Sequence, residues 1–138
     1  MDNQQITIEA IISKPIGEVW EKWSLPEHIV NWNHASDDWH TPSAENDFRA
    51  GGRFNYRMAA RDGSSGFDFW GTYDEIIPGK KVVYTLGDGR KVVNVFTEVD
   101  GGVKVVITFD AETTYPLEMQ KAGWGSILDN FKKYTEAA

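Results

Sequence analysis

The 138-residue chain contains no cysteine. Disulfides, thiolate metal ligands and cysteine nucleophiles are therefore excluded, and a chain without thiols fits a reducing compartment. The sequence also lacks long hydrophobic runs, since none approaches the roughly 20 apolar residues of a membrane-spanning helix. Residues 2–5 are polar, and no basic segment precedes an apolar one, which argues against a signal peptide. We therefore expect a cytoplasmic protein without membrane insertion.

Positive charge is scarce. There are 14 lysines and arginines against 21 aspartates and glutamates, which gives a formal net charge of −7. Because an acidic surface repels a phosphate backbone, we expect no nucleic-acid partner. Arg53, Arg57 and Arg61 recur at a spacing of four along a predicted strand and its end, so they share one face. We interpret them as solvating that face and pairing with carboxylates on neighbouring strands.

Aromatic residues, in contrast, are abundant: six tryptophans, five tyrosines and seven phenylalanines. Large rings pack well in cores, and they also line apolar ligand sites. The length and the 41% hydrophobic content suffice for one sizeable core. Since the chain shows no repeat and no linker, we predict a single domain over residues 1–138.

The N-terminal third predicts one strand and two helices. Apolar and polar residues alternate over 6–12, as in a half-buried strand. After Pro15, apolar residues recur at helical spacing and form one buried face: Ile16, Val19, Trp20 and Trp23. The segment 24–27 has the Ser-x-x-Glu form of a capping box, which predicts a second short helix with Trp32 inward. Residues 33–47 lack periodicity, so we predict a loop with a short strand only at 39–41.

From residue 53 the sequence predicts antiparallel strands joined by glycine-containing turns. The predicted strands are 53–60, 67–77, 81–86, 90–99 and 103–110. The first of them follows Gly51-Gly52 and alternates strictly, so that Phe54, Tyr56 and Met58 share an apolar face. In the second, Phe69 and Tyr73 share one face and Trp70 the other, and the sequence leaves open which face points inward.

A long amphipathic helix is predicted at the C-terminus. Its apolar stripe holds Leu117, Trp124, Ile127, Leu128 and Phe131, with Gln120 among them. Gly123 and Gly125 flank Trp124, although a glycine in a helix interior costs about 1 kcal/mol relative to alanine. This predicts that other backbone passes close by. A curved sheet around this helix would place Trp124 opposite the apolar face of strand 53–60.

Four segments, in this order, resemble bacterial homologues of the activator of the heat-shock-protein-90 ATPase: Pro15–Trp20, Asp47–Phe54, Gly71–Pro78 and Gly123-Trp124. That family belongs to the START-like, or SRPBCC, superfamily. The resemblance implies an α+β helix-grip fold. In this fold a curved antiparallel sheet of about seven strands wraps around a long C-terminal helix, and two short helices follow the first strand. Only the C-terminal domain of the eukaryotic activator is matched, so ATPase activation is not carried over.

The resemblance also implies a cavity between sheet and helix, in which superfamily members carry lipids, sterols and other apolar ligands. From the residues alone, the apolar side chains could equally pack against one another as a solid core. Gln120 could orient a ligand or bond to a strand. We predict a ligand cavity for an apolar or lipid-like small molecule, without a cofactor, in a monomer or weak homodimer. The predicted lining residues are Trp32, Trp39, Phe54, Tyr56, Met58, Phe69, Tyr73, Gln120, Trp124, Leu128 and Phe131.

Two other functions remain open. A cyclase or dehydratase acting on a polyketide-like substrate would need an acid–base pair inside the cavity, such as His34, His40 or Tyr56 beside a carboxylate. His28, His34 and His40 show no standard metal-ligand spacing, and Gly51-Gly52 lacks the pattern of a phosphate loop, so we predict no metal and no catalytic residue. An interaction module linked to a chaperone and to stress would need an exposed apolar patch.

Overall fold

The structure is a computed structural model, and it describes residues 4–137. Seven strands and three helices follow one another along the chain. They are β1 (Gln5–Ile12), α1 (Ile16–Ser24), α2 (Pro26–Trp32), β2 (Trp39–Asn46), β3 (Arg53–Ala60), β4 (Gly66–Ile77), β5 (Lys81–Leu86), β6 (Lys91–Val99), β7 (Gly102–Asp110) and α3 (Leu117–Ala137).

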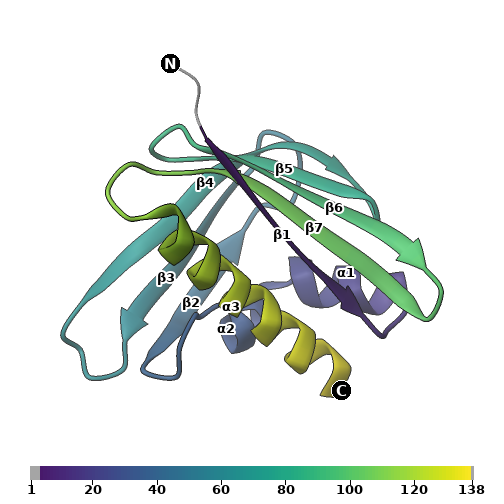
Figure 1. Cartoon of the computed structure of the whole chain (residues 1–138), viewed down its shortest axis with the longest axis horizontal. Coiled ribbons are helices and arrows are strands. Elements are labelled where there is room, and N and C mark those ends of the chain that lie inside the picture. The colour runs from purple at the N-terminus through teal and green to yellow at the C-terminus, as the bar shows by residue number, and fades with distance from the viewer. Residues whose placement is uncertain (1–3, 138) are drawn as a thin grey trace.

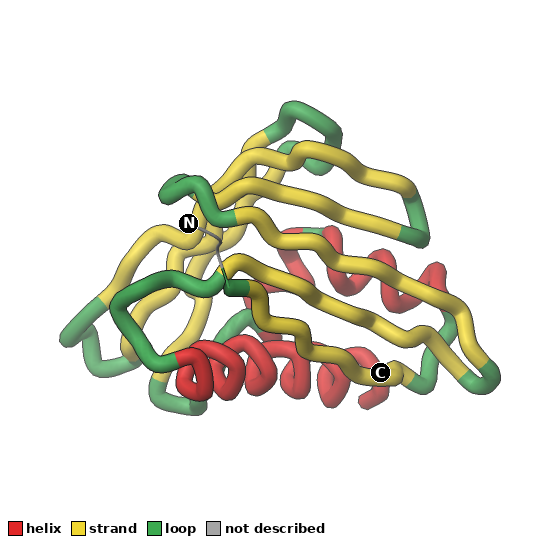
Figure 2. Tube along the Cα trace, turned by 45° about the horizontal axis from the view of Figure 1, so that its top comes forward, coloured by secondary structure: helices red, strands yellow, loops and turns green. Residues whose placement is uncertain are grey.

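The strands form one antiparallel sheet in the order β1-β7-β6-β5-β4-β3-β2. The sheet is curved, and α3 runs along its concave side (Figures 1 and 2). In the view of Figure 1, α1 and α2 lie behind α3. β1 and β2 follow one another along the chain but lie at opposite edges of the sheet, because α1 and α2 carry the chain from one edge to the other. The expected helix-grip architecture is confirmed.

One end of the concave side is a solid aromatic core. The ring of Trp23 lies among those of Trp32, Phe96 and Phe131, with centroids 5.2, 5.4 and 5.1 Å away. Phe131 is fully buried. Aromatic pairs at such distances add to the energy of area burial. These contacts fasten α1, α2 and the C-terminal half of α3 to the sheet.

Two local predictions were wrong. β2 spans eight residues rather than three, because it pairs with β3 from Trp39↔Ala60 to Asn46↔Phe54 across an irregularity between His40 and Ser43. This pairing with a distant strand overrides the weak local pattern. Ser24 does not begin α2 through a capping box. It ends α1, and its hydroxyl donates to the Trp20 carbonyl oxygen at 2.8 Å.

The close backbone expected at Gly123 and Gly125 is also absent: a Cβ added at either glycine would meet nothing within 4 Å among the described residues. Close approach occurs in the sheet instead. A Cβ at Gly71 would lie 2.6 Å from the Thr85 carbonyl oxygen and 2.9 Å from the Phe54 ring. Glycine is therefore required at the centre of β4, where Phe54 packs over the strand.

Candidate functional site

A cavity of about 170 Å³ lies between the concave face of the sheet and α3. Strands β3 to β7 contribute to its wall, and so do all three helices. It lies beside the aromatic core, which shares Trp23 and Trp32 with the cavity wall. The two alternatives left open by the sequence therefore both occur, side by side: a solid core at one end and an open space at the other.

The sheet side of the cavity is built by side chains that alternate along β3 and β4. Tyr56 of β3 lies opposite Phe69 of β4 in the strand register, and their rings are stacked with centroids 6.3 Å apart and planes inclined by 21°. Tyr73 continues the same face of β4, whereas Trp70 points to the outer face, where its ring meets the Arg53 guanidinium. The inward face of β4 is thus the one that carries Phe69 and Tyr73.

The helix side consists mainly of Trp124, Ile127 and Leu128. The Trp124 ring stacks on Phe109 of β7, with centroids 4.0 Å apart and an interplanar angle of 11°. It also contacts Phe69 of β4 in a T-shaped arrangement, with ring centroids 6.0 Å apart. Trp124 is therefore anchored on β7 and reaches toward β4, rather than lying on the Phe54 side of the sheet.

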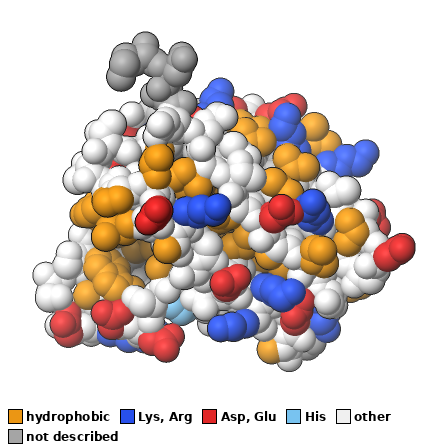
Figure 3. Space-filling view, viewed as in Figure 1, with side chains coloured by type: hydrophobic (Ala, Val, Ile, Leu, Met, Phe, Trp, Pro, Cys, Tyr) orange, Lys and Arg blue, Asp and Glu red, His pale blue; other side chains and the backbone are white. Residues whose placement is uncertain are grey.

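The cavity is most open where β3 and β4 meet the β3–β4 turn. Met58 and Phe67 lie opposite each other there and line the cavity, and Phe67 is 48% exposed. The Trp39 ring of β2 lies 6.1 Å from that of Phe67. Figure 3 shows hydrophobic side chains gathered around a hollow on this side of the molecule, where the first turns of α3 approach the far ends of β3 and β4. This is the natural mouth of the cavity.

A few uncharged polar groups reach the cavity wall, among them Tyr56, Tyr73 and Tyr84. Burial raises the pKa of all three hydroxyls, and for Tyr56 and Tyr84 the proximity of Tyr73 raises it further. Asn46 donates to the Tyr73 hydroxyl at 3.3 Å. The tyrosines are therefore neutral hydrogen-bonding groups at physiological pH.

The structure brings seven of the eleven sequence-predicted residues to the cavity wall: Trp32, Tyr56, Met58, Phe69, Tyr73, Trp124 and Leu128. The other four lie elsewhere. Phe54 packs below the wall, with the rings of Tyr56, Tyr73 and Tyr84 at 5.0, 5.1 and 4.8 Å. Phe131 belongs to the aromatic core, and Trp39 lies beside the mouth against Phe67.

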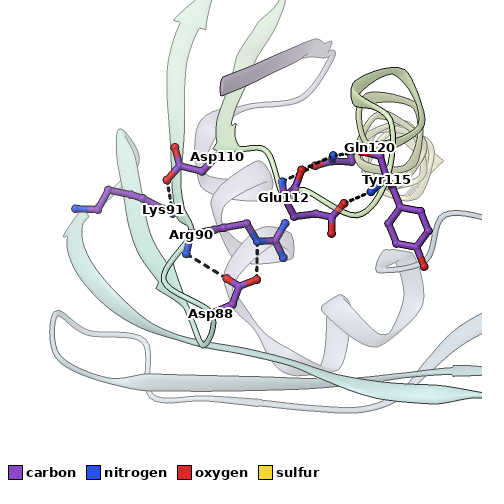
Figure 4. Close-up of polar contacts among 7 residues, drawn as sticks. All are labelled: Asp88, Arg90, Lys91, Asp110, Glu112, Tyr115 and Gln120. Carbon is purple, nitrogen blue, oxygen red and sulfur yellow. Dashed lines mark hydrogen bonds and ion pairs between the residues drawn. The ribbon is translucent and has the colours of Figure 1, made fainter. Parts of the chain in front are cut away.

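Gln120 does not line the cavity, although it is buried. Its Oε1 accepts from the Glu112 backbone N–H at 2.9 Å, and its Nε2 donates to the carbonyl oxygens of Glu112 and Tyr115 at 3.1 and 2.8 Å (Figure 4). The Glu112 carboxylate in turn accepts from the Tyr115 backbone N–H at 2.6 Å. Gln120 therefore holds the loop that leads from β7 into α3.

Sequence reasoning missed several residues of the wall. Trp23 was predicted only as part of the buried face of the first helix, yet it contributes to both the core and the cavity wall. Tyr84 and Asn94, on β5 and β6, were not considered. Asn94 did carry a signal: it interrupts the buried apolar alternation of Val92 and Phe96 on an inward strand face. A polar residue in such a position has to find a partner.

The histidines lie outside the cavity wall. His28 of α2 hydrogen-bonds to the Tyr134 hydroxyl of α3 at 2.7 Å and so links the two helices. The His34 carbonyl oxygen accepts from Asn130 of α3 at 2.5 Å. The pKa of His34 is lowered, first by burial and then by Arg61, while Asp37 opposes the shift. Within the described residues there is no cluster of three or more histidine, aspartate or glutamate side chains suited to a metal ion.

Comparison with known proteins gives a consistent result. The family model "Activator of Hsp90 ATPase homolog 1-like protein" matches residues 13–136. The solution structure of an AHSA1-like protein from Aeromonas hydrophila is 47% identical and has a TM-score of 0.92. The match covers 97% of this chain and 93% of that one. A search of curated proteins found no match.

Two further solved structures are similar. A protein from Cytophaga hutchinsonii is 47% identical with a TM-score of 0.84, over 96% of this chain and 92% of that one. A protein from Nitrosomonas europaea has the same TM-score of 0.84 at 18% identity, over 96% of this chain and 94% of that one, and so shares the fold. None of the described helices is long and apolar enough to cross a membrane.

Proposed function

Because the chain belongs to the family of Activator of Hsp90 ATPase homolog 1-like proteins, with a START-like fold, we propose that it is a cytoplasmic binding protein for an apolar or aromatic small molecule. One observation carries the proposal: a cavity of about 170 Å³, walled by aromatic side chains, lies between the sheet and α3. Small-molecule sites are concave and mostly apolar, with a few polar groups that fix orientation. This cavity has mostly apolar walls and a few uncharged polar groups, as such sites do.

Binding is favoured over catalysis by the composition of the wall. A cyclase or dehydratase needs a proton donor and acceptor beside the substrate. Among the residues described here, those that line the cavity include no aspartate, glutamate, histidine, lysine or arginine. The raised pKa values of Tyr56, Tyr73 and Tyr84 keep these hydroxyls protonated, so they do not act as general bases, and make them weaker acids. We therefore assign the cavity to holding a ligand, with no catalytic residue.

The proposed mechanism is burial of the apolar surface of the ligand against the rings of Tyr56, Phe69 and Trp124. Burial of apolar area contributes about 25 cal/mol per Å², less the cost of immobilising the ligand. The ligand enters between Met58, Phe67 and the first turns of α3. Phe67 is 48% exposed and contacts the Trp39 ring, so rotation of its side chain would widen this entrance.

Native mass spectrometry of the protein purified from its own host tests the proposal. We expect a noncovalent small-molecule adduct that is lost in a Met58→Trp variant, in which the larger ring fills the cavity. Titration of the emptied protein with toluene should change the tryptophan fluorescence, because Trp23, Trp32 and Trp124 border the cavity. Absence of both an adduct and toluene binding would refute the proposed function.

A further inference from the structure

The ligand class can be narrowed by one buried polar group. We infer that the cavity selects a neutral, single-ring aromatic molecule carrying a hydrogen-bond donor, and that Asn94 accepts this hydrogen bond through its Oδ1. The inference rests on the proposed function, because it concerns the same cavity. It assigns the orientation of the ligand: the donor lies deep, against β5 and β6, and the apolar part of the ring faces α3 and the mouth.

Asn94 lies at the centre of β6 and has no exposed surface. It pairs with Val82 of β5 on one side and with Ile107 of β7 on the other, and all three line the cavity. Its inward neighbours along the strand, Val92 and Phe96, are buried and apolar. Apart from the Tyr84 hydroxyl, with which its side chain also interacts, the Asn94 amide is therefore surrounded by apolar side chains on this part of the wall.

The hydrogen bonds of Asn94 are incomplete. Its Nδ2 donates to the Val82 carbonyl oxygen at 3.0 Å, whereas its Oδ1 is buried and receives no hydrogen bond from any described residue. The amide cannot be turned over, because Oδ1 would then face the Val82 oxygen and two acceptors would meet. The group that remains unpaired is thus an acceptor, and its complement is an O–H or N–H.

A hydrogen-bond donor on the ligand would pair with the unsatisfied Oδ1 of Asn94. A buried polar atom without a partner is destabilising, and pairing it recovers that loss. The neighbouring Tyr84 hydroxyl, kept neutral by burial, offers a second polar group at the same end of the cavity. A molecule with a hydroxyl or an amine N–H at one end therefore fits the deep wall better than a hydrocarbon of the same size.

Charge and size limit the ligand further. Of the residues described, those in the cavity wall carry no charged side chain, so a carboxylate or ammonium would be buried without a counter-charge, at high cost. The volume of about 170 Å³ is close to that of an engineered cavity of roughly 150 Å³ that binds benzene. These limits favour one ring over a long acyl chain, and a neutral molecule over a fatty acid.

A calorimetric comparison of two isomers isolates the donor. p-Cresol and anisole have the same atoms, but only p-cresol has an O–H to donate. Since a neutral hydrogen bond corresponds to about a fivefold change in affinity, we expect p-cresol to bind the wild-type protein about fivefold more tightly than anisole. The anion 4-methylbenzoate should not bind. Equal affinities for the two isomers, or binding of 4-methylbenzoate, would overturn the inference and leave the proposed function standing.

Asn94→Leu removes the acceptor at nearly constant side-chain volume, so the preference for p-cresol over anisole should disappear. Ile107→Val is the matched control, because it changes the same part of the wall without touching the amide and should shift both affinities alike. Should Asn94→Leu fail to fold, the side-chain amide resonance of Asn94 in the wild type gives the second measurement: it should move with p-cresol and not with anisole. If neither isomer binds, the inference is refuted; the proposed function is refuted as well only if the native adduct and toluene binding are also absent.

Discussion

Trp124 of α3 lies flat on Phe109 of β7, with ring centroids 4.0 Å apart and planes inclined by 11°. Phe109 is fully buried, whereas Trp124 is only partly buried, since its other side borders the cavity. The stack therefore fastens the first half of the helix to one side of the sheet. The cavity lies beside the contact of Trp124 with Phe69, between α3 and the inward faces of β3 and β4.

Trp124→Ala should lower the free energy of unfolding by about 2–4 kcal/mol, because it removes the stack with Phe109 and the contact with Phe69. Urea unfolding measures the change. Met119→Ala is the control on the same helix: Met119 is 57% exposed, so the change should stay within about 0.5 kcal/mol. Equal effects of the two substitutions would show that the stack contributes little.

Met58→Trp should fill the mouth of the cavity and weaken toluene binding by about tenfold or more, which corresponds to about 1.4 kcal/mol. Overpacking should lower the free energy of unfolding by about 1–3 kcal/mol. Calorimetric titration measures the affinity. Met119→Trp makes the same exchange on the exposed surface of α3 and should leave toluene binding unchanged. Unaltered binding in Met58→Trp would place the ligand elsewhere.

Gly125→Ala should raise the free energy of unfolding by about 0.5–1 kcal/mol, since alanine favours the helix and its Cβ has space around it. Gly71→Ala should lower it by about 2 kcal/mol or more, because the added Cβ meets the Thr85 backbone and the Phe54 ring. Thermal or urea unfolding of the two variants compares them. A lower free energy of unfolding in Gly125→Ala would contradict this prediction and would indicate that a further contact requires glycine at this position.

His34 should make the protein less stable in mild acid. Its pKa in the folded state lies below the ordinary value of 6.5, chiefly because of burial, so the unfolded state binds a proton more readily. The free energy of unfolding should therefore be greatest above about pH 7 and fall as the pH drops below about 6.5. His34→Gln should flatten this dependence. NMR titration of the imidazole gives the pKa directly, and a value at or above 6.5 would contradict the prediction.

The order and type of the elements could be predicted because their periodicities are strong. Alternation marked β1 and β3, glycine-containing turns marked the limits of the strands that follow, and the apolar stripe marked α3. The errors arose where a distant partner decides the local structure. β2 extends to Asn46 because β3 offers hydrogen bonds along its whole length, which no local pattern records. Gly123 and Gly125 were read as signs of close packing, yet the structure leaves space at both.

The cavity was less predictable than the fold. Alternation shows that Phe54 and Tyr56 share a face, but it does not show that the Phe54 ring packs over Gly71, which has no side chain, and is buried beneath its neighbours. The depth of a side chain within a curved sheet depends on strands far along the chain. Asn94 was detectable in principle, as a lone amide in an apolar alternation, although its unpaired oxygen is visible only in three dimensions.

The pairing of β1 with β7 has a consequence for biosynthesis. Gln5 lies opposite Asp110, so the first strand to leave the ribosome finds its hydrogen-bonding partner only after a further hundred or so residues have been made. At about 5–20 residues per second, β1 spends several seconds or more with both of its edges unpaired. Its polar exposed residues, Thr7 and Glu9 among them, make an unpaired edge less prone to join another nascent chain. Closure of the sheet is thus a late event, which can occur only shortly before α3 becomes available to cover it.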